Sequence, residues 1–295
     1  MAHLPSLLPL FFLLQILLGV HASVSDGSSL QLDYNPYICS KSYMCGDVSI
    51  SYPFYLSNEV GHINSTSYYC GYTDLNITCI QDGVNYKAII QLAGHEYTIK
   101  EINYNNKTIV LTDSDALRGG KCPRVRHNVS FDEGWLQYPT SPENLTFLFG
   151  CNLSAGDPRI ATKDKNRISC KVSSNSPGLS FVFTPGEFDA STESELAKYC
   201  DPPIFVPLDG NHMAELENNQ TMLLAEYGVM IEKGFELAWR LGKNDGCDLC
   251  QKSHGQCAYS QNKTLLGCLC SDGKMAVGST NCSRPSKSFE TFPSF

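Results

Sequence analysis

Hydrophobic and polar residues alternate along much of the chain, which is the pattern of half-buried β-strands. Residues 48–52 show this alternation directly before Pro53. Residues 97–104 repeat it, and the Asn105-Asn106 turn and the β-branched run 108–111 that follow predict a β-hairpin. Further strands are expected at 147–149, 179–183 and 235–239.

Helical segments are fewer in the same pattern. A short helix is expected at 193–199, with Ser191 or Thr192 as its N-cap and Glu195 placed for a capping box. Pro202 and Pro203 follow it as stop signals, and a second helix is expected at 216–227. No period of about 20 to 50 residues recurs, which argues against a solenoid or a propeller. The pattern therefore predicts a mainly β fold.

The first residues predict export. An uncharged apolar run spans residues 7–20, and Val20-His21-Ala22 places small residues where a signal peptide is cleaved, after Ala22. The alternative is a membrane anchor, but the run is short for a span of about 20 residues. We expect residues 1–22 to be removed, 23–35 to form a flexible serine-rich segment, and 284–295 to form a polar tail.

All 14 cysteines follow this signal, and an even number in an exported chain predicts disulfides. The alternative is a zinc site at Cys247, Cys250, Cys268 and Cys270, which an oxidising compartment disfavours. Acceptor sequences for N-glycosylation agree with export, and glycans are expected at Asn64, Asn76, Asn106, Asn128, Asn144, Asn152, Asn219 and Asn262. Asn281 is disfavoured because the middle residue of its acceptor sequence is Cys282.

Composition narrows the function classes. Of the 295 residues 42 % are hydrophobic, so the chain can build a core. Its 22 Lys and Arg against 30 Asp and Glu leave a net charge of -8, which argues against a nucleic-acid partner. We find no hydrolase elbow, zinc-protease motif, glycine-rich phosphate loop or kinase catalytic loop in the sequence. We therefore expect no enzymatic activity, no cofactor and no metal.

Several motifs carry a resemblance to a known family. Cys45-Gly46, followed by Ile-Ser-Tyr-Pro-Phe at 50–54, resembles the signature of the galacturonan-binding domain of plant wall-associated receptor kinases. Further blocks that resemble this domain or its companion C-terminal domain lie at 70–79, 97–109, 147–151, 234–239 and 247–270. The leaf-rust-resistance receptor-like kinases share both domains, and the resemblance covers residues 36–283. One departure is His254, where the family usually has glycine.

The resemblance implies two cysteine-rich extracellular domains, a galacturonan-binding-like domain at 36–152 and a C-terminal domain at 153–283. The last six cysteines have a spacing similar to that of an EGF-like module, over 247–282. That module implies the pairs Cys247–Cys257, Cys250–Cys268 and Cys270–Cys282. Family members also carry a Ser/Thr kinase domain and a membrane-anchoring segment, and we find the motifs of neither in this sequence.

The implied ligand has its own chemical requirements. Galacturonan carries one carboxylate per sugar, so its site needs cationic side chains and aromatic ring faces. Two basic windows supply the cations, and the candidate ligand-binding residues are Arg118, Lys121, Arg124, Arg126, Lys163, Lys165, Arg167, Tyr52 and Trp135. The alternatives are that the basic windows are solvated surface and that Tyr52 and Trp135 belong to the core. A glycan on Asn128 would also crowd the first window.

The function that follows is an expectation from this resemblance and the basic windows. We expect a non-catalytic, extracellular domain of a cell-wall-sensing receptor-like protein that binds an acidic cell-wall polysaccharide of the pectin or oligogalacturonide type. The alternative is a protein-interaction ectodomain or a soluble decoy that binds a peptide or a co-receptor. We expect the chain to be secreted into the apoplast and cell wall, whereas family members are anchored in the plasma membrane.

Overall fold

The computed structural model describes residues 31–33, 39, 41–58, 61–63, 66–118, 125–154, 156–169, 178–208, 220–240, 246–277 and 281–282. The predicted signal peptide 1–22 and polar tail 284–295 lie outside these residues, as do Lys121, Arg124, Asn64 and Asn219. None of the helices in the described segments combines the length and the hydrophobicity that a membrane crossing requires.

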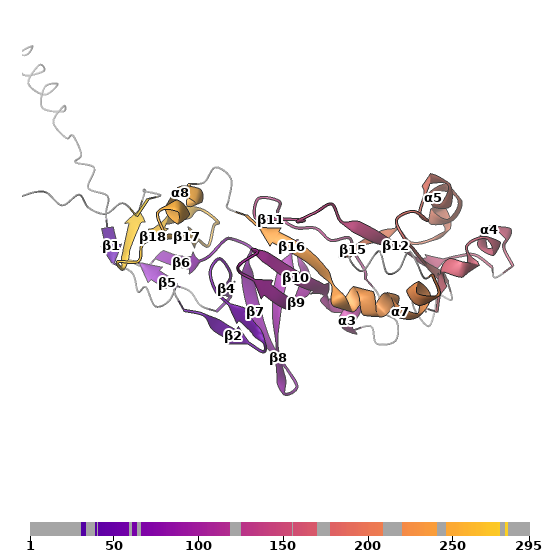
Figure 1. Cartoon of the computed structure of the whole chain (residues 1–295), viewed down its shortest axis with the longest axis horizontal. Coiled ribbons are helices and arrows are strands. Elements are labelled where there is room, and N and C mark those ends of the chain that lie inside the picture. Colours follow the sequence, from indigo (N-terminus) through magenta and orange to yellow (C-terminus); the bar gives the residue numbers. More distant parts are fainter. Residues whose placement is uncertain are drawn as a thin grey trace, which may run out of the picture.

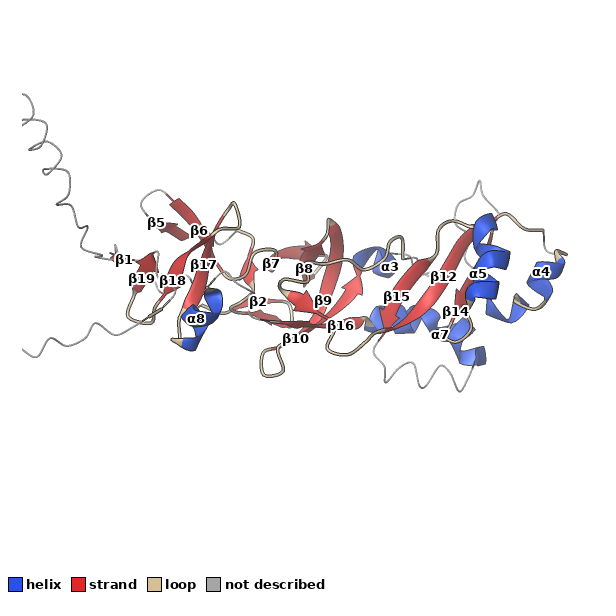
Figure 2. Ribbon diagram, turned by 90° about the horizontal axis from the view of Figure 1, so that it is seen from above, coloured by secondary structure: helices blue, strands red, loops and turns tan. Residues whose placement is uncertain are grey.

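Three β-sheets follow one another along the long axis of the molecule (Figures 1 and 2). We call the first the cysteine-rich sheet, because its strands adjoin the last six cysteines. It has the order β1-β19-β18-β17-β6-β5. Its strands are β1 (Gln31–Asp33), β5 (Gly61–Ile63), β6 (Thr66–Cys70), β17 (Gln256–Ser260), β18 (Leu265–Leu269) and β19 (Lys274–Val277). Helix α8 (Cys247–Lys252) precedes β17.

The central sheet has the order β11-β16-β10-β9-β8-β7-β4. Its strands are β4 (Tyr55–Leu56), β7 (Asn76–Asp82), β8 (Asn85–Leu92), β9 (His95–Asn103), β10 (Thr108–Asp113), β11 (Leu136–Gln137) and β16 (Phe235–Trp239). The β9–β10 hairpin is the one that the sequence predicts, with Ile99 opposite Leu111. A two-stranded hairpin, β2 (Tyr43–Cys45) and β3 (Val48–Ile50), accompanies it, and helix α3 (Ser114–Arg118) follows β10 directly.

The small sheet has the order β13-β14-β12-β15 and carries the remaining helices. Its strands are β12 (Glu143–Cys151), β13 (Arg167–Ile168), β14 (Leu179–Phe183) and β15 (Ile204–Leu208). The helices are α4 (Pro158–Ala161), η1 (Asp164–Asn166), α5 (Ala190–Leu196), η2 (Ala197–Tyr199) and α7 (Gln220–Lys233). The predicted N-cap of α5 is wrong: the Asp189 side chain accepts the 2.8 Å hydrogen bond from Thr192 N, and the helix begins at Ala190.

Strands from the two predicted domains share sheets. β16 lies between β10 and β11, with Leu237 opposite Ile109 and Trp239 opposite Leu136. β17 pairs with β6 in the cysteine-rich sheet. In Figure 1, the orange and yellow C-terminal strands therefore lie beside purple N-terminal ones. Each of the three sheets therefore contains strands from both sides of the predicted boundary near residue 152.

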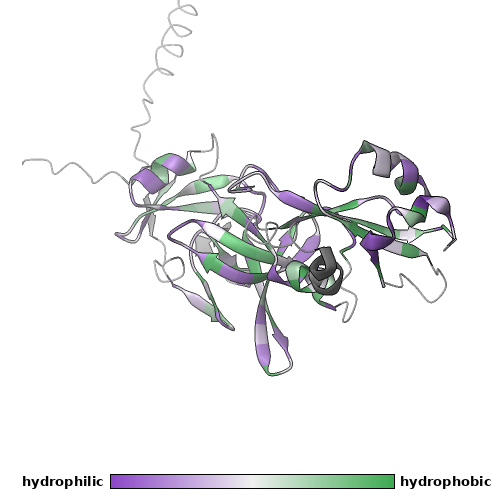
Figure 3. Ribbon diagram, turned by 45° about the vertical axis from the view of Figure 1, so that its right-hand side comes forward, coloured by the Kyte–Doolittle hydropathy of each residue, from purple (hydrophilic) through white to green (hydrophobic). Residues whose placement is uncertain are grey.

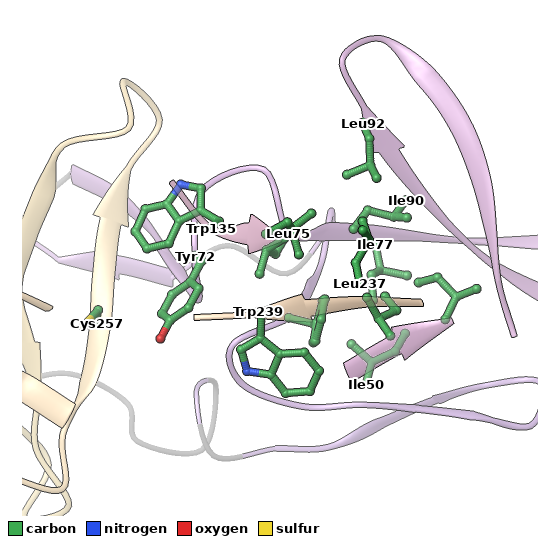
Figure 4. Packing of buried hydrophobic residues seen from close by; sticks show 14 of the residues in the cluster. Ile50, Tyr72, Leu75, Ile77, Ile90, Leu92, Trp135, Leu237, Trp239 and Cys257 are labelled. Atoms are coloured by element: carbon green, nitrogen blue, oxygen red, sulfur yellow. The ribbon is translucent and has the colours of Figure 1, made fainter. Parts of the chain in front are cut away.

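The main core fills the space between the central sheet and the cysteine-rich part. Apolar and polar residues alternate along the strands (Figure 3), and the apolar set faces inward. Ile50, Ile77 and Leu237 are completely buried in this cluster (Figure 4). Two buried rings, Tyr72 and Trp135, extend it toward the cysteine-rich sheet. The apolar positions that predict strands in the sequence are thus the positions that build the core.

Disulfides fix the chain at six described places. Three pairs join segments that lie 31 to 49 residues apart: Cys39–Cys70 at the cysteine-rich sheet, Cys45–Cys79 at the central sheet and Cys151–Cys200 at the small sheet. The C-terminal pairs are Cys247–Cys257, Cys250–Cys268 and Cys270–Cys282, the same three that the family resemblance implies. No cysteine in the described segments is free, so these thiols hold no zinc there. That this end forms an EGF-like module stays a prediction.

Gly255 sits against two of these disulfides. A β-carbon at this position would lie 2.2 Å from Cys268 Sγ and 2.8 Å from Cys250 Sγ, and 2.7 Å from Cys282 Sγ. Sulfur atoms in a bridge cannot move aside as the end of a flexible side chain can. We predict that Gly255→Ala lowers the free energy of unfolding by about 1 to 3 kcal/mol.

Urea denaturation of the purified protein, together with a count of free thiols, tests this prediction. Gly186→Ala is the control, because an added β-carbon there meets nothing within 4 Å. The prediction fails if Gly255→Ala forms all of its disulfides and keeps the wild-type urea midpoint.

Candidate functional site

The first basic window is largely matched by acidic side chains. Arg118 Nη2 lies 2.9 Å from Glu96 Oε2, and Arg118 Nη1 lies 3.4 Å from Asp115 Oδ1. Arg126 Nε lies 3.9 Å from the other oxygen of the same Asp115 carboxylate. Both described arginines are exposed, so these pairs contribute little to stability, but they reduce the net positive charge of the window.

The second basic window is paired in the same way. Lys165 Nζ lies 3.0 Å from Glu187 Oε1, and Arg167 Nη1 lies 3.1 Å from Asp164 Oδ1. Lys163 donates a 2.7 Å hydrogen bond to Thr192 Oγ1. This window belongs to the small sheet, whereas Arg118 ends α3 beside the central sheet. The two windows lie on different elements, but Val125 of the first and Ile168 of the second belong to one buried hydrophobic cluster.

The two aromatic candidates have different surroundings. Trp135 is only 9 % exposed, and its ring packs 4.6 Å from the Tyr72 ring and 5.6 Å from the Tyr259 ring, measured between centroids (Figure 4). It packs in the core and also borders a separate cavity of about 480 Å³, and its choice as a ligand-binding residue stays a prediction. Tyr52 is half-buried, and its hydroxyl accepts hydrogen bonds from Gln251 Nε2 at 2.6 Å and from Cys257 N at 3.1 Å.

Tyr52 lines a groove of about 470 Å³ between the cysteine-rich sheet and the central sheet. One wall comes from the end of α8 and the start of β17, and the other comes from the β9–β10 turn and the end of β16. The lining residues are Tyr52, Pro53, Tyr72, Tyr104, Lys107, Trp239, Gln251, His254, Gly255 and Gln256. Clefts between packed units are common places for ligand binding. We call this feature the aromatic groove.

Hydrogen bonds hold the aromatic walls in place. The Gln251 amide donates to the Tyr52 hydroxyl and to the Tyr72 hydroxyl, each at 2.6 Å. The Tyr104 hydroxyl accepts from Ser51 N at 2.6 Å and lies 3.0 Å from Ser49 O, to which it donates. Burial raises the pKa of Tyr104, so its hydroxyl keeps the proton that this second bond requires. The walls are thus ordered before any ligand arrives.

The charged residues of the groove are unusual in both composition and backbone. Lys107 and His254 are exposed at its rim, and no acidic residue lines it. Both residues have left-handed backbones, with φ of 56° for Lys107 and 62° for His254. That conformation costs about 1–2 kcal/mol for a residue with a β-carbon. Strained residues of this kind concentrate at functional sites.

Lys107 and His254 are not predicted as site residues from the sequence, because neither belongs to a cluster of basic residues. Each stands alone in its own turn, and only folding brings the two turns to one groove. Two signals were present in the sequence. Lys107 follows the Asn105-Asn106 turn, and His254 stands where the resembling family usually has glycine.

Family comparisons place these features in a known class of proteins. Residues 39–113 match the wall-associated receptor kinase galacturonan-binding family, and residues 169–273 match the wall-associated receptor kinase C-terminal family. The two matched segments lie in the N-terminal and the C-terminal part of the chain. The aromatic groove draws residues from both matched segments.

Individual relatives point to one branch of this class. The chain is similar to the Arabidopsis thaliana protein named leaf rust 10 disease-resistance locus receptor-like protein kinase-like 2.1, with 24 % identity over 84 % of this chain and 37 % of the relative. It is also similar to the Arabidopsis thaliana protein named leaf rust 10 disease-resistance locus receptor-like protein kinase-like 1.2, with 26 % identity over 83 % of this chain and 34 % of the relative. The chain thus spans about a third of the length of these relatives. No solved structure is significantly similar to it.

Glu187 allows the pairing of the second basic window to be tested by pH. Burial raises the pKa of its carboxyl group, but hydrogen bonds from Thr184 N, Lys165 and Asn166 outweigh burial and lower the pKa overall. A carboxylate whose pKa falls on folding stabilises the fold above the ordinary glutamate range near about 4.3. That stabilisation is lost as the pH falls through the lowered pKa. We predict that Glu187→Gln is less stable than the wild type at pH 7, and that the difference vanishes in acid.

Urea midpoints measured between neutral pH and about pH 3 test this prediction. Glu101→Gln, on an exposed position of β9, is the control and should change little. A stability difference for Glu187→Gln that persists unchanged in acid would show that the charge of Glu187 is not its source.

Proposed function

We propose that this chain is a non-catalytic binding domain for an acidic, pectin-type polysaccharide, and that the aromatic groove is its site. The match of residues 39–113 to a galacturonan-binding family supports the substrate class. The groove supports the location, because it combines aromatic walls, amide groups, a lysine and a histidine with no acidic lining residue. The single observation that carries the proposal is that Lys107 and His254 both occupy strained, left-handed turns.

The chemistry of a uronide chain fits this lining. The apolar face of a sugar ring would pack against the partly exposed rings of Tyr52 and Tyr104. Its carboxylates would pair with Lys107 and His254, and its hydroxyls with the glutamine amides. Exposed ion pairs contribute well under about 1 kcal/mol each. Tight binding would therefore need several contacts along the polymer or several copies of the receptor.

The net charge of -8 is compatible with this proposal only if the attraction is local. The described cations of the two basic windows lie within 4.0 Å of carboxylates or, for Lys163, bond to a hydroxyl. Lys107 and His254 face a groove without acids, so a bound carboxylate meets no repulsion from the lining. Over longer distances the acidic surface would repel a polyanion. We therefore expect slow association, and we expect low salt to strengthen only the contacts made after the ligand has reached the groove.

We further propose that the protein works outside the cell as a secreted glycoprotein of the apoplast and cell wall. The described disulfides support this location, because such bonds persist in oxidising compartments. The acceptor residues Asn106, Asn128, Asn152 and Asn262 are exposed, and Asn76 and Asn144 are partly exposed, as glycan attachment requires. A glycan on Asn106 would lie next to Lys107 at the rim of the aromatic groove.

Glycine substitutions separate binding from folding in this groove. Lys107→Gly and His254→Gly each remove a basic side chain and also relieve strain of about 1–2 kcal/mol. The added flexibility of the unfolded chain offsets about 0.4–1 kcal/mol of that gain. We predict that each variant keeps its free energy of unfolding within about 1 kcal/mol of the wild type and loses up to about 1 kcal/mol of affinity for oligogalacturonides, roughly fivefold.

Lys263→Gly is a matched control. Lys263 also stands in an Asn-Lys-Thr sequence, also has a left-handed backbone (φ 61°), and lies outside the aromatic groove. Calorimetric titration at two salt concentrations, in an Asn106→Gln background that removes the neighbouring glycan, measures the effect. If Lys263→Gly weakens binding as much as Lys107→Gly, or if neither groove variant changes it, the site lies elsewhere.

The alternative function, a protein-interaction ectodomain, has one structural observation in its favour. Of the large hydrophobic side chains that are exposed in the described segments, four lie on the β2–β3 and β7–β8 hairpins: Met44, Ile80, Val84 and Tyr86. Val84 is 93 % exposed at the tip of the β7–β8 hairpin, which projects from the body of the molecule (Figure 1). Exposed apolar groups of this kind favour a protein partner over a sugar.

Val84→Asp tests this alternative without touching the aromatic groove. We predict that a protein retained by the wild-type chain from pectinase-treated apoplastic fluid is lost with Val84→Asp, because a charge at the hairpin tip opposes apolar contact. The partner is then purified and titrated against both chains, with oligogalacturonide affinity as the control that should not change. Equal retention by both chains, or retention that pectinase abolishes, contradicts a role for the hairpin.

A further inference from the structure

A buried polar cluster lies at the end of β10, away from the aromatic groove. Asp113 closes that strand and begins the turn into α3. Its Oδ1 accepts hydrogen bonds from Asp115 N at 2.8 Å and from Ala116 N at 3.2 Å, which caps the short helix. The side chain is 93 % buried, and its Oδ2 accepts no hydrogen bond. One oxygen of this carboxylate is therefore explained by the fold, and the other is not.

The unexplained oxygen faces a histidine. His127 Nε2 lies 3.2 Å from Asp113 Oδ2, but the two atoms are not aligned as a hydrogen bond. His127 Nδ1 lies 3.3 Å from the carbonyl oxygen of Asn128. A carbonyl oxygen can only accept, so this contact places the ring proton on Nδ1. In the neutral ring, the lone pair of Nε2 then faces a carboxylate oxygen, and the two repel each other unless a cation lies between them.

The surroundings hold the imidazole in this orientation. The His95 ring stacks on the His127 ring with centroids 3.5 Å apart, and the edge of the Tyr97 ring meets it at 5.9 Å. The Tyr97 hydroxyl lies 3.5 Å from Nδ1. A histidine that ligates a metal through one nitrogen commonly donates from the other nitrogen to a backbone carbonyl. His127 has this arrangement.

The geometry of the cluster matches the coordination of a small divalent ion. The side-chain ligand atoms of Asp113, Asp115 and His127 all lie within 4.8 Å of one another. Bonds of about 2.0–2.1 Å at tetrahedral angles would place two ligand atoms about 3.3 Å apart, close to the separation of Nε2 and Oδ2. An ion at this place would satisfy the buried oxygen and remove the repulsion between the lone pairs.

We propose that Asp113, Asp115 and His127 form a site for a zinc-class divalent cation. An imidazole ligand favours zinc and its neighbours over calcium, which takes oxygen ligands alone. His127 also borders a cavity of about 540 Å³ with Arg126 and Asn128, so water or an anion could reach the remaining coordination position. Two arginines compete for Asp115: Arg118, which has its shorter contact with Glu96 and lies 3.4 Å from Asp115 Oδ1, and Arg126, whose Nε lies 3.9 Å from Asp115 Oδ2.

Isothermal titration of the full-length, chelator-treated secreted protein with ZnCl2 at pH 7 tests the proposal. We expect one Zn²⁺ per chain, and no competition from a roughly tenfold excess of CaCl2. The absorption spectrum of bound Co²⁺ should indicate nitrogen and oxygen ligands without thiolate, because the described cysteines are all in disulfides. Zn²⁺ should also raise the thermal midpoint of the wild type.

Asp113→Asn and His127→Gln are the decisive variants. The amide oxygen introduced by Asp113→Asn would keep the helix cap while the charge is lost, so a folding defect is not expected. Each variant should weaken Zn²⁺ binding at least about tenfold and abolish the thermal shift. His254→Gln is the control histidine and should bind Zn²⁺ as the wild type does. Asp115→Asn provides a third readout if either decisive variant fails to fold.

Two outcomes would overturn the proposal. One is the absence of stoichiometric Zn²⁺ binding to the wild type. The other is binding that Asp113→Asn and His127→Gln leave unchanged. Either result would leave Asp113 and His127 as neighbouring side chains that hold no ion. Oligogalacturonide binding depends on different residues, so its success or failure is measured separately.

Discussion

The pairing of β16 with β10 joins segments that are far apart in the sequence, and the aromatic groove depends on it. Leu237 sits opposite Ile109 in the ladder, and Trp239 N donates a 3.0 Å hydrogen bond to the carbonyl oxygen of Lys107. This bond holds the strained turn that carries the Lys107 side chain. Gly234 makes the approach possible, because a β-carbon there would lie 2.1 Å from the carbonyl oxygen of Leu111. One backbone ladder thus sets both a wall of the groove and the position of its cation.

A second contact fixes the other wall. Gln251 on α8 bridges the hydroxyls of Tyr52 and Tyr72, which belong to the N-terminal part of the chain. Its amide nitrogen satisfies both hydroxyls in a setting where an unsatisfied polar group would cost about 1–3 kcal/mol. The cysteine-rich sheet is therefore held to the central sheet by directional bonds as well as by apolar contact, and the groove between them has a defined width.

Local patterns in the sequence were sufficient for the strands, and insufficient for the site. Alternation places the β9–β10 hairpin and the strand at 235–239 correctly, because each depends on neighbouring residues. The helix at 193–199 was displaced because Asp189, just before the expected cap, offers a carboxylate to Thr192 N. The acidic partners of the basic windows could not be predicted for a different reason. Glu187 and Glu96, which pair with Lys165 and Arg118, are distant in the sequence, so a local count of charge misses them.

The order of synthesis gives the β16 ladder a further consequence. A ribosome adds roughly 5–20 residues per second, so β10 emerges several seconds before the strand that covers its edge. An open edge of that kind is a template for wrong pairing. The missing edge partner also matters for evolution. A recombination that carried residues 39–113 into another gene without residues 235–239 would leave β10 without its neighbour β16, so the two matched segments are expected to be inherited together.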